Sequence, residues 1–154
     1  MEIIDHLERL VRELRRQRIP YALCGGLAMA VHASPRATLG IDLLVEERDL
    51  ESIKSLASDL GFTLDTGWVP TRADDVRIYR MAFPDPELED VLPLDLILVS
   101  PALEEVWKSR MEVEWEHGPL SVVSRGGLAG MKALRGSGQD QEDIRRLQEG
   151  EERP

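Results

Sequence analysis

YALCGGLAMAVHASPRATLGIDLLVE, residues 21–46, contains the strongest structural signals of this sequence. Two short apolar runs, residues 21–24 and 41–45, are bounded by turn signals and are too short for helices, which predicts two buried strands. The Ala-, Leu- and Met-rich residues that follow Gly25 and Gly26 predict a short helix. Pro35 ends this helix, because the residue before a proline is kept out of the α region. The order strand, glycine turn, helix, strand predicts an α/β domain.

The glycine turn and two aspartates are the candidate functional residues. Gly25 and Gly26 leave the unpaired N–H groups of a helix start accessible, which favours a bound phosphate. Asp42 lies inside an apolar strand, and residues 92–99 (LPLDLILV) predict a second such strand around Asp95. Carboxylates on adjacent central strands can converge on Mg²⁺, which prefers hard oxygen ligands. The alternative for each aspartate is a structural bond to an arginine or to backbone N–H groups.

This pattern, strand, Gly-Gly, helix, Arg-x-Thr-x-x-Ile-Asp, strand, resembles the nucleotidyltransferase fold of the polymerase-beta superfamily. It is most similar to the small bacterial abortive-infection toxin nucleotidyltransferases. The resemblance implies a mixed β-sheet flanked by helices, in the α/β (α+β) class. It also implies a nucleoside triphosphate bound with Mg²⁺ and transfer of a nucleotide to an acceptor hydroxyl on RNA, protein or a small molecule. The matching residues are Gly25, Gly26, Arg36, Thr38, Ile41 and Asp42.

The resemblance assigns roles to individual residues. It implies that Asp42 and Asp95 are catalytic metal ligands, and that Arg36 and Thr38 contact the nucleotide together with the glycine turn. Arg36 has an equal alternative as a structural ion pair.

The late segment, residues 127–147, resembles the lysine-bearing helix and the following Asp-containing helix of these toxins. The resemblance implies that Lys132 reaches the triphosphate, with a catalytic role, and that Asp143 supports it; Asp140 is the other position carried over. The alternatives are a surface lysine and charges that cap a helix start.

The sequence departs from the family pattern at one position. Where the family has Asp-x-Asp, this chain has Gly40-Ile41-Asp42. Positions 40 and 42 face the same side of a strand, so the glycine removes one metal ligand and one negative charge. One ion could still be held by Asp42, Asp95 and phosphate oxygens, whereas a second ion loses its bridging ligand. Restoring aspartate at position 40 is therefore expected to raise metal affinity and transfer.

Three hypotheses about function follow. The first is a Mg²⁺-dependent nucleotidyltransferase. The second is a catalytically degenerate binding module, acting as a nucleotide sensor or with a protein partner in a toxin–antitoxin-type pair, and Gly40 favours it over the first. The third is an α/β domain in which the glycine turn and the aspartates are only structural.

Composition limits the remaining possibilities. The 154 residues, 42% hydrophobic and 31% charged, predict one globular domain over residues 1–150 with a frayed acidic tail, 151–154. No apolar run approaches the roughly 20 residues of a membrane span, and the N-terminus lacks the apolar region of a signal peptide. Cys24 is the only cysteine, which predicts a reducing, cytoplasmic location.

The net charge of −10 disfavours tight unaided binding of nucleic acid, because binding to phosphates normally needs a basic surface. Local basic patches are possible, with solvated ion-paired faces as the favoured alternative. The two candidate groups are Arg72, Arg77 and Arg80, and Lys132, Arg135, Arg145 and Arg146.

Periodicity and turn signals predict the remaining elements. Helices are predicted at residues 2–17, 48–60 and 101–109, then from a Ser124 cap to residue 135, and from an Asp140 cap to about residue 149. Strands are predicted at 76–83, half exposed, and at 112–116 and 120–123 around a turn at residues 117–119. A strand can begin at 62–64, and 66–75 is predicted to be a loop or hairpin connection. The three tryptophans, Trp68, Trp107 and Trp115, are expected to be packing anchors.

Overall fold

The computed structural model describes residues 2–32, 40–71, 76–84, 86, 91–135, 144–145 and 147–148. Its helices are α1 (Ile3–Arg16), α2 (Gly25–His32), α3 (Leu50–Asp59), α4 (Glu104–Lys108) and α5 (Arg125–Arg135), with single 3₁₀ turns before α3 and α4. Its strands are β1 (Ala22–Cys24), β2 (Ile41–Val45), β3 (Leu64–Val69), β4 (Ile78–Phe83), β5 (Leu92–Leu98), β6 (Met111–Trp115) and β7 (Gly118–Val122).

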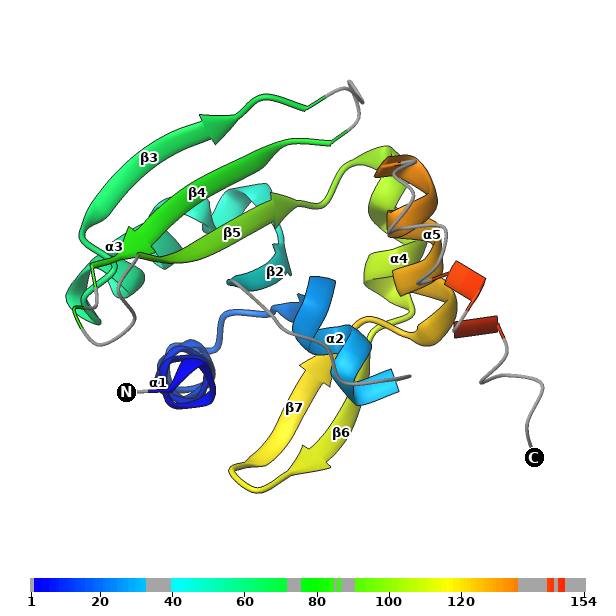
Figure 1. Cartoon of the computed structure of the whole chain (residues 1–154), viewed down its shortest axis with the longest axis horizontal. Coiled ribbons are helices and arrows are strands. Elements are labelled where there is room, and N and C mark those ends of the chain that lie inside the picture. Colours follow the sequence, from blue (N-terminus) through cyan, green and yellow to red (C-terminus); the bar gives the residue numbers. More distant parts are fainter. Residues whose placement is uncertain are drawn as a thin grey trace.

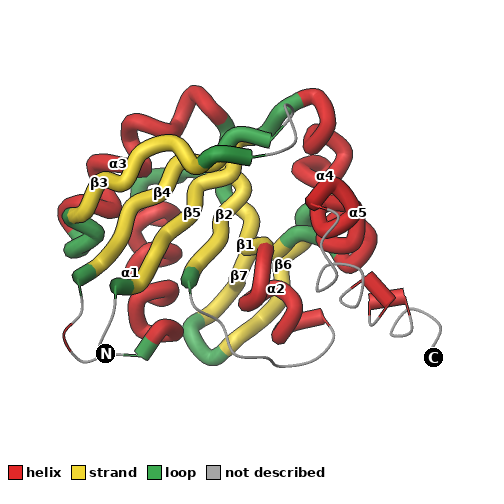
Figure 2. Tube along the Cα trace, turned by 45° about the horizontal axis from the view of Figure 1, so that its top comes forward, coloured by secondary structure: helices red, strands yellow, loops and turns green. Residues whose placement is uncertain are grey.

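These strands form one mixed sheet in the order β3-β4-β5-β2-β1-β7-β6. The pairs β2–β5 and β1–β7 are parallel, and the other neighbours are antiparallel. Helices α1 and α3 lie behind the sheet in Figure 2, whereas α2 lies in front of it. Helices α4 and α5 pack together beyond one end of the strands (Figure 1). The predicted α/β fold with a mixed sheet flanked by helices is confirmed.

The core lies mainly between the sheet and its helices. The apolar stripe predicted for the first helix is buried, with Leu7, Leu10 and Leu14 at 1% exposure or less. The central strands β2 and β5 are apolar on both faces, since Leu43, Leu44 and Leu96 are fully buried. Strands covered on both faces read as continuous apolar runs, which is why these two were recognisable in the sequence.

The prediction for residues 66–75 is wrong in its first part. Thr66 to Val69 belong to β3, an edge strand that pairs with β4, and the pairing register shifts between Asp65 and Gly67. Gly67 has a φ of +86° at this irregularity, as is common in β-bulges. Most side chains of β3 are exposed, so the strand shows no apolar alternation that could have identified it.

The prediction for the tryptophans holds for Trp107, which is buried, but not for Trp68, which is 50% exposed. The Trp68 ring packs edge-on against Tyr79, and the guanidinium of Arg77 lies over it. Trp115 is half-buried, so its exposure lies between those of Trp107 and Trp68.

Smaller predictions near the C-terminus have mixed outcomes. The hairpin is present, but its turn is Glu116 and His117, and Gly118 already begins β7 with a φ of +101°. Ser124 caps α5 as predicted, because its Oγ accepts a hydrogen bond from the Gly127 N–H at 2.9 Å. The Asp140 cap and the tail 151–154 lie outside the described residues.

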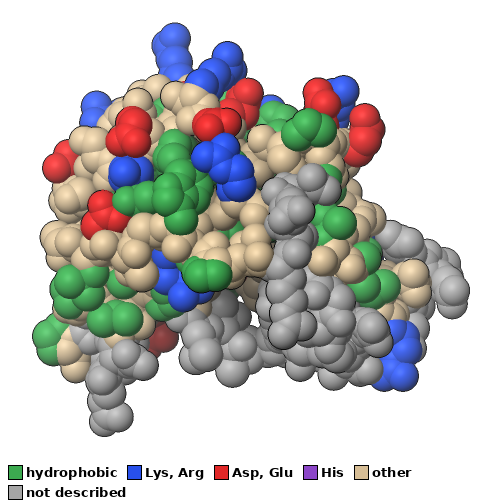
Figure 3. All heavy atoms as spheres, turned by 90° about the horizontal axis from the view of Figure 1, so that it is seen from above, with side chains coloured by type: hydrophobic (Ala, Val, Ile, Leu, Met, Phe, Trp, Pro, Cys, Tyr) green, Lys and Arg blue, Asp and Glu red, His purple; other side chains and the backbone are tan. Residues whose placement is uncertain are grey.

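Charged side chains of both signs are interspersed over the face shown in Figure 3. Arg77 is ion-paired with Glu47 and Arg80 with Asp95, so two of the three arginines in the first candidate patch follow the ion-paired alternative. Arg72 lies outside the described residues. Among the residues that the structure describes, none of the helices has both the length and the hydropathy of a membrane span.

Candidate functional site

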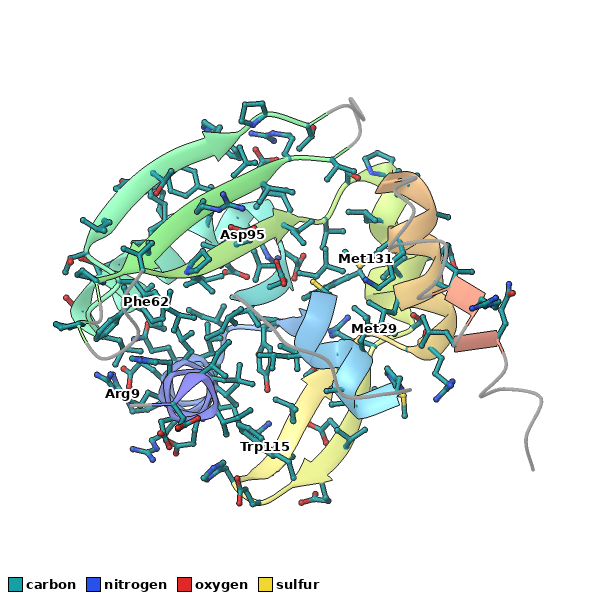
Figure 4. The ribbon with its side chains drawn as sticks, in the orientation of Figure 1. Arg9, Met29, Phe62, Asp95, Trp115 and Met131 are labelled. Carbon is teal, nitrogen blue, oxygen red and sulfur yellow. The ribbon has the colours of Figure 1, made fainter. Side chains whose placement is uncertain are left out.

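The pairing of β2 with β5 brings the two predicted aspartates together. The strands are parallel, and Asp42 is the register partner of Asp95. Partners in adjacent parallel strands point to the same face of a sheet, so the prediction that the two aspartates lie on neighbouring strands and face the same side is confirmed. Their shared function as a site stays a prediction. Figure 4 labels Asp95 on β5, the strand between β4 and β2.

Asp42 also lies against the glycine turn. Gly25 has a φ of +67°, and a Cβ added there would lie 2.2 Å from Oδ2 of Asp42. Position 25 therefore needs glycine for two reasons, its backbone conformation and the closeness of the carboxylate. A negative charge at the start of α2 is favourable, because the helix dipole is positive there. Asp42 thus lies beside the helix start that was predicted to bind phosphate, next to the buried Gly26.

Asp95 is held by an arginine from the neighbouring strand. Arg80 on β4 is its register partner, and its Nε and one terminal nitrogen donate to Oδ1 and Oδ2 of Asp95 at 2.7 and 2.9 Å. The hydrogen bonds that Arg80 donates to Asp95, together with the negative charges of Asp95 and Asp42, raise the pKa of Arg80 above its usual value. Asp95 therefore makes the bond to an arginine that the sequence left open as the alternative to metal binding.

Arg80 is a site residue that the sequence does not single out. Its sequence neighbours place it only in a candidate basic patch. The available signal was that Arg80 shares one side of a predicted strand with Ile78, but nothing in the sequence showed that this strand would pair with β5.

Lys132 on α5 is not the surface lysine of the alternative interpretation, because it is only 2% exposed. Lys132 and both aspartates influence the same buried residue, Cys24, which is the register partner of Asp42. Burial raises the pKa of the Cys24 thiol well above its usual value, Asp42 and Asp95 add to this increase, and Lys132 opposes it. The Lys132 ammonium therefore acts on the same small region as both carboxylates.

The buried thiol gives a first prediction. Native protein at pH 8 is expected to react with iodoacetamide at least about tenfold more slowly than protein unfolded in urea, because the thiolate is the nucleophile and burial suppresses it. Mass spectrometry of the Cys24 peptide over time measures both rates. Equal rates would show that the thiol is accessible and that the packing around Cys24 and Asp42 is open.

Position 40 does not have room for the missing carboxylate. A Cβ on Gly40 would lie 2.8 Å from Cγ and 2.8 Å from the carbonyl oxygen of Pro93. Because positions 40 and 42 share a face, the sequence predicts that aspartate could be restored there. That expectation overlooked Pro93 on β5, which fills the space that a side chain at position 40 would need.

The remaining predicted site residues have no described position. Arg36, Thr38 and Asp143 lie outside the described residues, as does Asp140. Within the described part of the chain, no three His, Cys, Asp or Glu side chains are grouped so that they could hold a metal ion. Together with the Arg80 contact to Asp95, this donor set does not fit the pair of Mg²⁺ ions that the resemblance implies.

Comparison with known protein families and with curated protein sequences gave no match. Solved structures with the same fold were found. A Thermotoga maritima protein described as a nucleotidyltransferase has a TM-score of 0.63 and 13% identity, over 95% of this chain and 92% of its own. The lincosamide adenylyltransferase LnuA, with lincomycin bound, has a TM-score of 0.63 and 16% identity, over 94% of this chain and 95% of its own.

A third structure, ANT(2'')-Ia in complex with adenylyl-2''-tobramycin, has a TM-score of 0.59 and 12% identity, over 94% of this chain and 86% of its own. At these identities the likeness concerns the fold. This chain therefore has the fold of nucleotidyltransferases, and the finer resemblance to abortive-infection toxins stays a prediction.

Proposed function

We propose that this protein binds a nucleoside triphosphate at the cluster of Asp42, Asp95 and Arg80 beside the start of α2, and that it does not carry out efficient nucleotidyl transfer. The observation that carries the proposal is the register pairing of Asp42 with Asp95 next to the Gly25 turn. The nucleotidyltransferase fold supports a nucleotide as the ligand.

Two features support the loss of efficient transfer. Two-metal catalysis of nucleotidyl transfer uses carboxylates that hold one ion at the attacking oxygen and one at the leaving oxygen. Here Pro93 fills the place of one carboxylate, and Arg80 neutralises another. Removing a single group that stabilises the transition state typically slows a reaction by about 10²–10³-fold. The protein would then act as a nucleotide sensor, or through a protein partner.

A second candidate is an active transferase whose acceptor is a small-molecule hydroxyl. It is favoured by the likeness to two antibiotic-modifying proteins, one of them matched over 95% of its length. In this case a single Mg²⁺ would be held by Asp42 and by phosphate oxygens of the nucleotide.

Calorimetric titration tests the proposal. ATP is expected to bind saturably, and adenosine is not, because the cluster and the helix start recognise phosphates. A parallel incubation with labelled ATP and Mg²⁺ is expected to transfer no label to cell RNA, to protein or to a panel of hydroxyl-bearing small molecules. Absence of saturable ATP binding would overturn the proposal, and rapid transfer to a small molecule would establish the second candidate.

A further inference from the structure

Asp95 and Arg80 form a fixed unit in the candidate site. Both oxygens of Asp95 accept hydrogen bonds from the guanidinium, and the carboxylate side chain is 14% exposed whereas that of Arg80 is 40% exposed. A bidentate pair of this kind fixes the plane of the guanidinium. A divalent cation at Asp95 would have to displace the guanidinium or lie next to its positive charge.

The guanidinium keeps donors for a further ligand. The guanidinium group of an arginine carries five N–H donors. In Arg80, the N–H of Nε and one N–H of a terminal nitrogen donate to Asp95. Because the Arg80 side chain is 40% exposed, the donors not used by Asp95 can reach an incoming anion. The planar fork suits phosphate oxygens, which it can bind in pairs.

The charges of the cluster also argue against a metal. Asp42 and Asp95 are two negative charges, and Arg80, which is ion-paired with Asp95, offsets one of them. The formal sum of these three residues is −1, so the cluster offers less negative charge to a hard divalent cation than two unpaired carboxylates would.

We propose that Arg80, held in place by Asp95, substitutes for a divalent cation at this site and binds the phosphates of a nucleoside triphosphate directly. Asp95 is then a positioning residue for Arg80 and not a metal ligand. The inference rests on the proposed function, since it specifies how the nucleotide is bound. It predicts that metal-free ATP is a ligand at least as good as ATP with Mg²⁺.

The test compares wild type, Arg80→Gln and the matched control Arg77→Gln, which removes the same charge from an arginine that is paired with Glu47. Each is titrated calorimetrically with ATP, once in EDTA and once with Mg²⁺. Wild type is expected to bind at least as tightly in EDTA. Arg80→Gln is expected to weaken binding about 10–100-fold, because hydrogen bonds to charged groups are lost, and Arg77→Gln is expected to change it less than about twofold.

A second measurement follows the metal alone. Mn²⁺ titration monitored by electron paramagnetic resonance, without nucleotide, is expected to show tighter binding to Arg80→Gln than to wild type, because the substitution releases Asp95. If Arg80→Gln does not fold by circular dichroism, Arg80→Lys replaces it. This variant keeps the charge but lacks the planar fork, so weaker ATP binding in EDTA is again expected.

The outcomes separate the two proposals. ATP binding that requires Mg²⁺ and is unchanged or tighter in Arg80→Gln would overturn this inference and leave the proposed function standing. Tight Mn²⁺ binding by wild type, equal to that of the variant, would overturn the inference as well. Absence of ATP binding in both buffers would overturn the inference together with the proposed function.

Discussion

Gly25→Ala is expected to lower the free energy of unfolding by about 2–5 kcal/mol, one of the two largest effects that we expect from a single substitution. Alanine in a left-handed conformation costs roughly 1–2 kcal/mol, and Gly25 has a φ of +67°. Overpacking adds about 1–3 kcal/mol, because the new Cβ would lie 2.2 Å from Oδ2 and 2.7 Å from Cγ of Asp42. The midpoint of urea unfolding, with an unchanged slope, measures the loss.

Gly130→Ala is the matched control for this prediction. Gly130 is exposed inside α5, and a Cβ there meets nothing within 4 Å. Alanine in an open helix position is expected to raise the free energy of unfolding by about 0.5–1 kcal/mol. In an Asp42→Ala background, Gly25→Ala should lower the free energy of unfolding by less, because Oδ2 and Cγ of Asp42, the two atoms nearest to the new Cβ, are removed. An equal loss in both backgrounds would show that the carboxylate does not pack against Gly25.

Gly40→Asp is expected to destabilise the protein by about 1–3 kcal/mol rather than to restore a metal site. The new Cβ would lie 2.8 Å from the carbonyl oxygen of Pro93, and a backbone atom of a paired strand cannot yield as the end of a flexible side chain can. The melting temperature should fall by roughly 3–9 °C. Differential scanning calorimetry measures the change, and the labelled-ATP assay should show no gain in transfer.

Gly126→Asp is the matched control, because it makes the same glycine-to-aspartate change at an exposed position. Gly126 is exposed in the first turn of α5, a Cβ there meets nothing within 4 Å, and a negative charge is favourable at a helix start. This variant should melt within about 2 °C of wild type. A Gly40→Asp variant that is as stable as wild type and that gains transfer would show that β5 yields at Pro93. It would also show that the glycine alone prevents catalysis.

Much of the fold could be predicted from residues whose neighbours lie close in the sequence. Strands β1, β2 and β5 are apolar runs bounded by turn residues, and β2 was predicted with its observed bounds, Ile41–Val45. The stripe of α1 and the cap at Ser124 are also local patterns. A strand start was predicted at residues 62–64, but the rest of β3 was missed because β3 is an edge strand with most of its side chains in solvent. Its sequence therefore lacks the apolar alternation of a half-buried strand.

The sequence by itself determined that Asp42 and Asp95 would lie in buried strands and that Gly25 would begin a helix, because burial and backbone conformation restrict residue types locally. Only the tertiary structure decided what these residues contact. Arg80 pairs with Asp95, and Pro93 fills the space at Gly40, because β5 lies between β4 and β2 in one particular register. Strand order and register depend on the packing of the whole core, and a shift of one residue would turn each of these side chains to the opposite face.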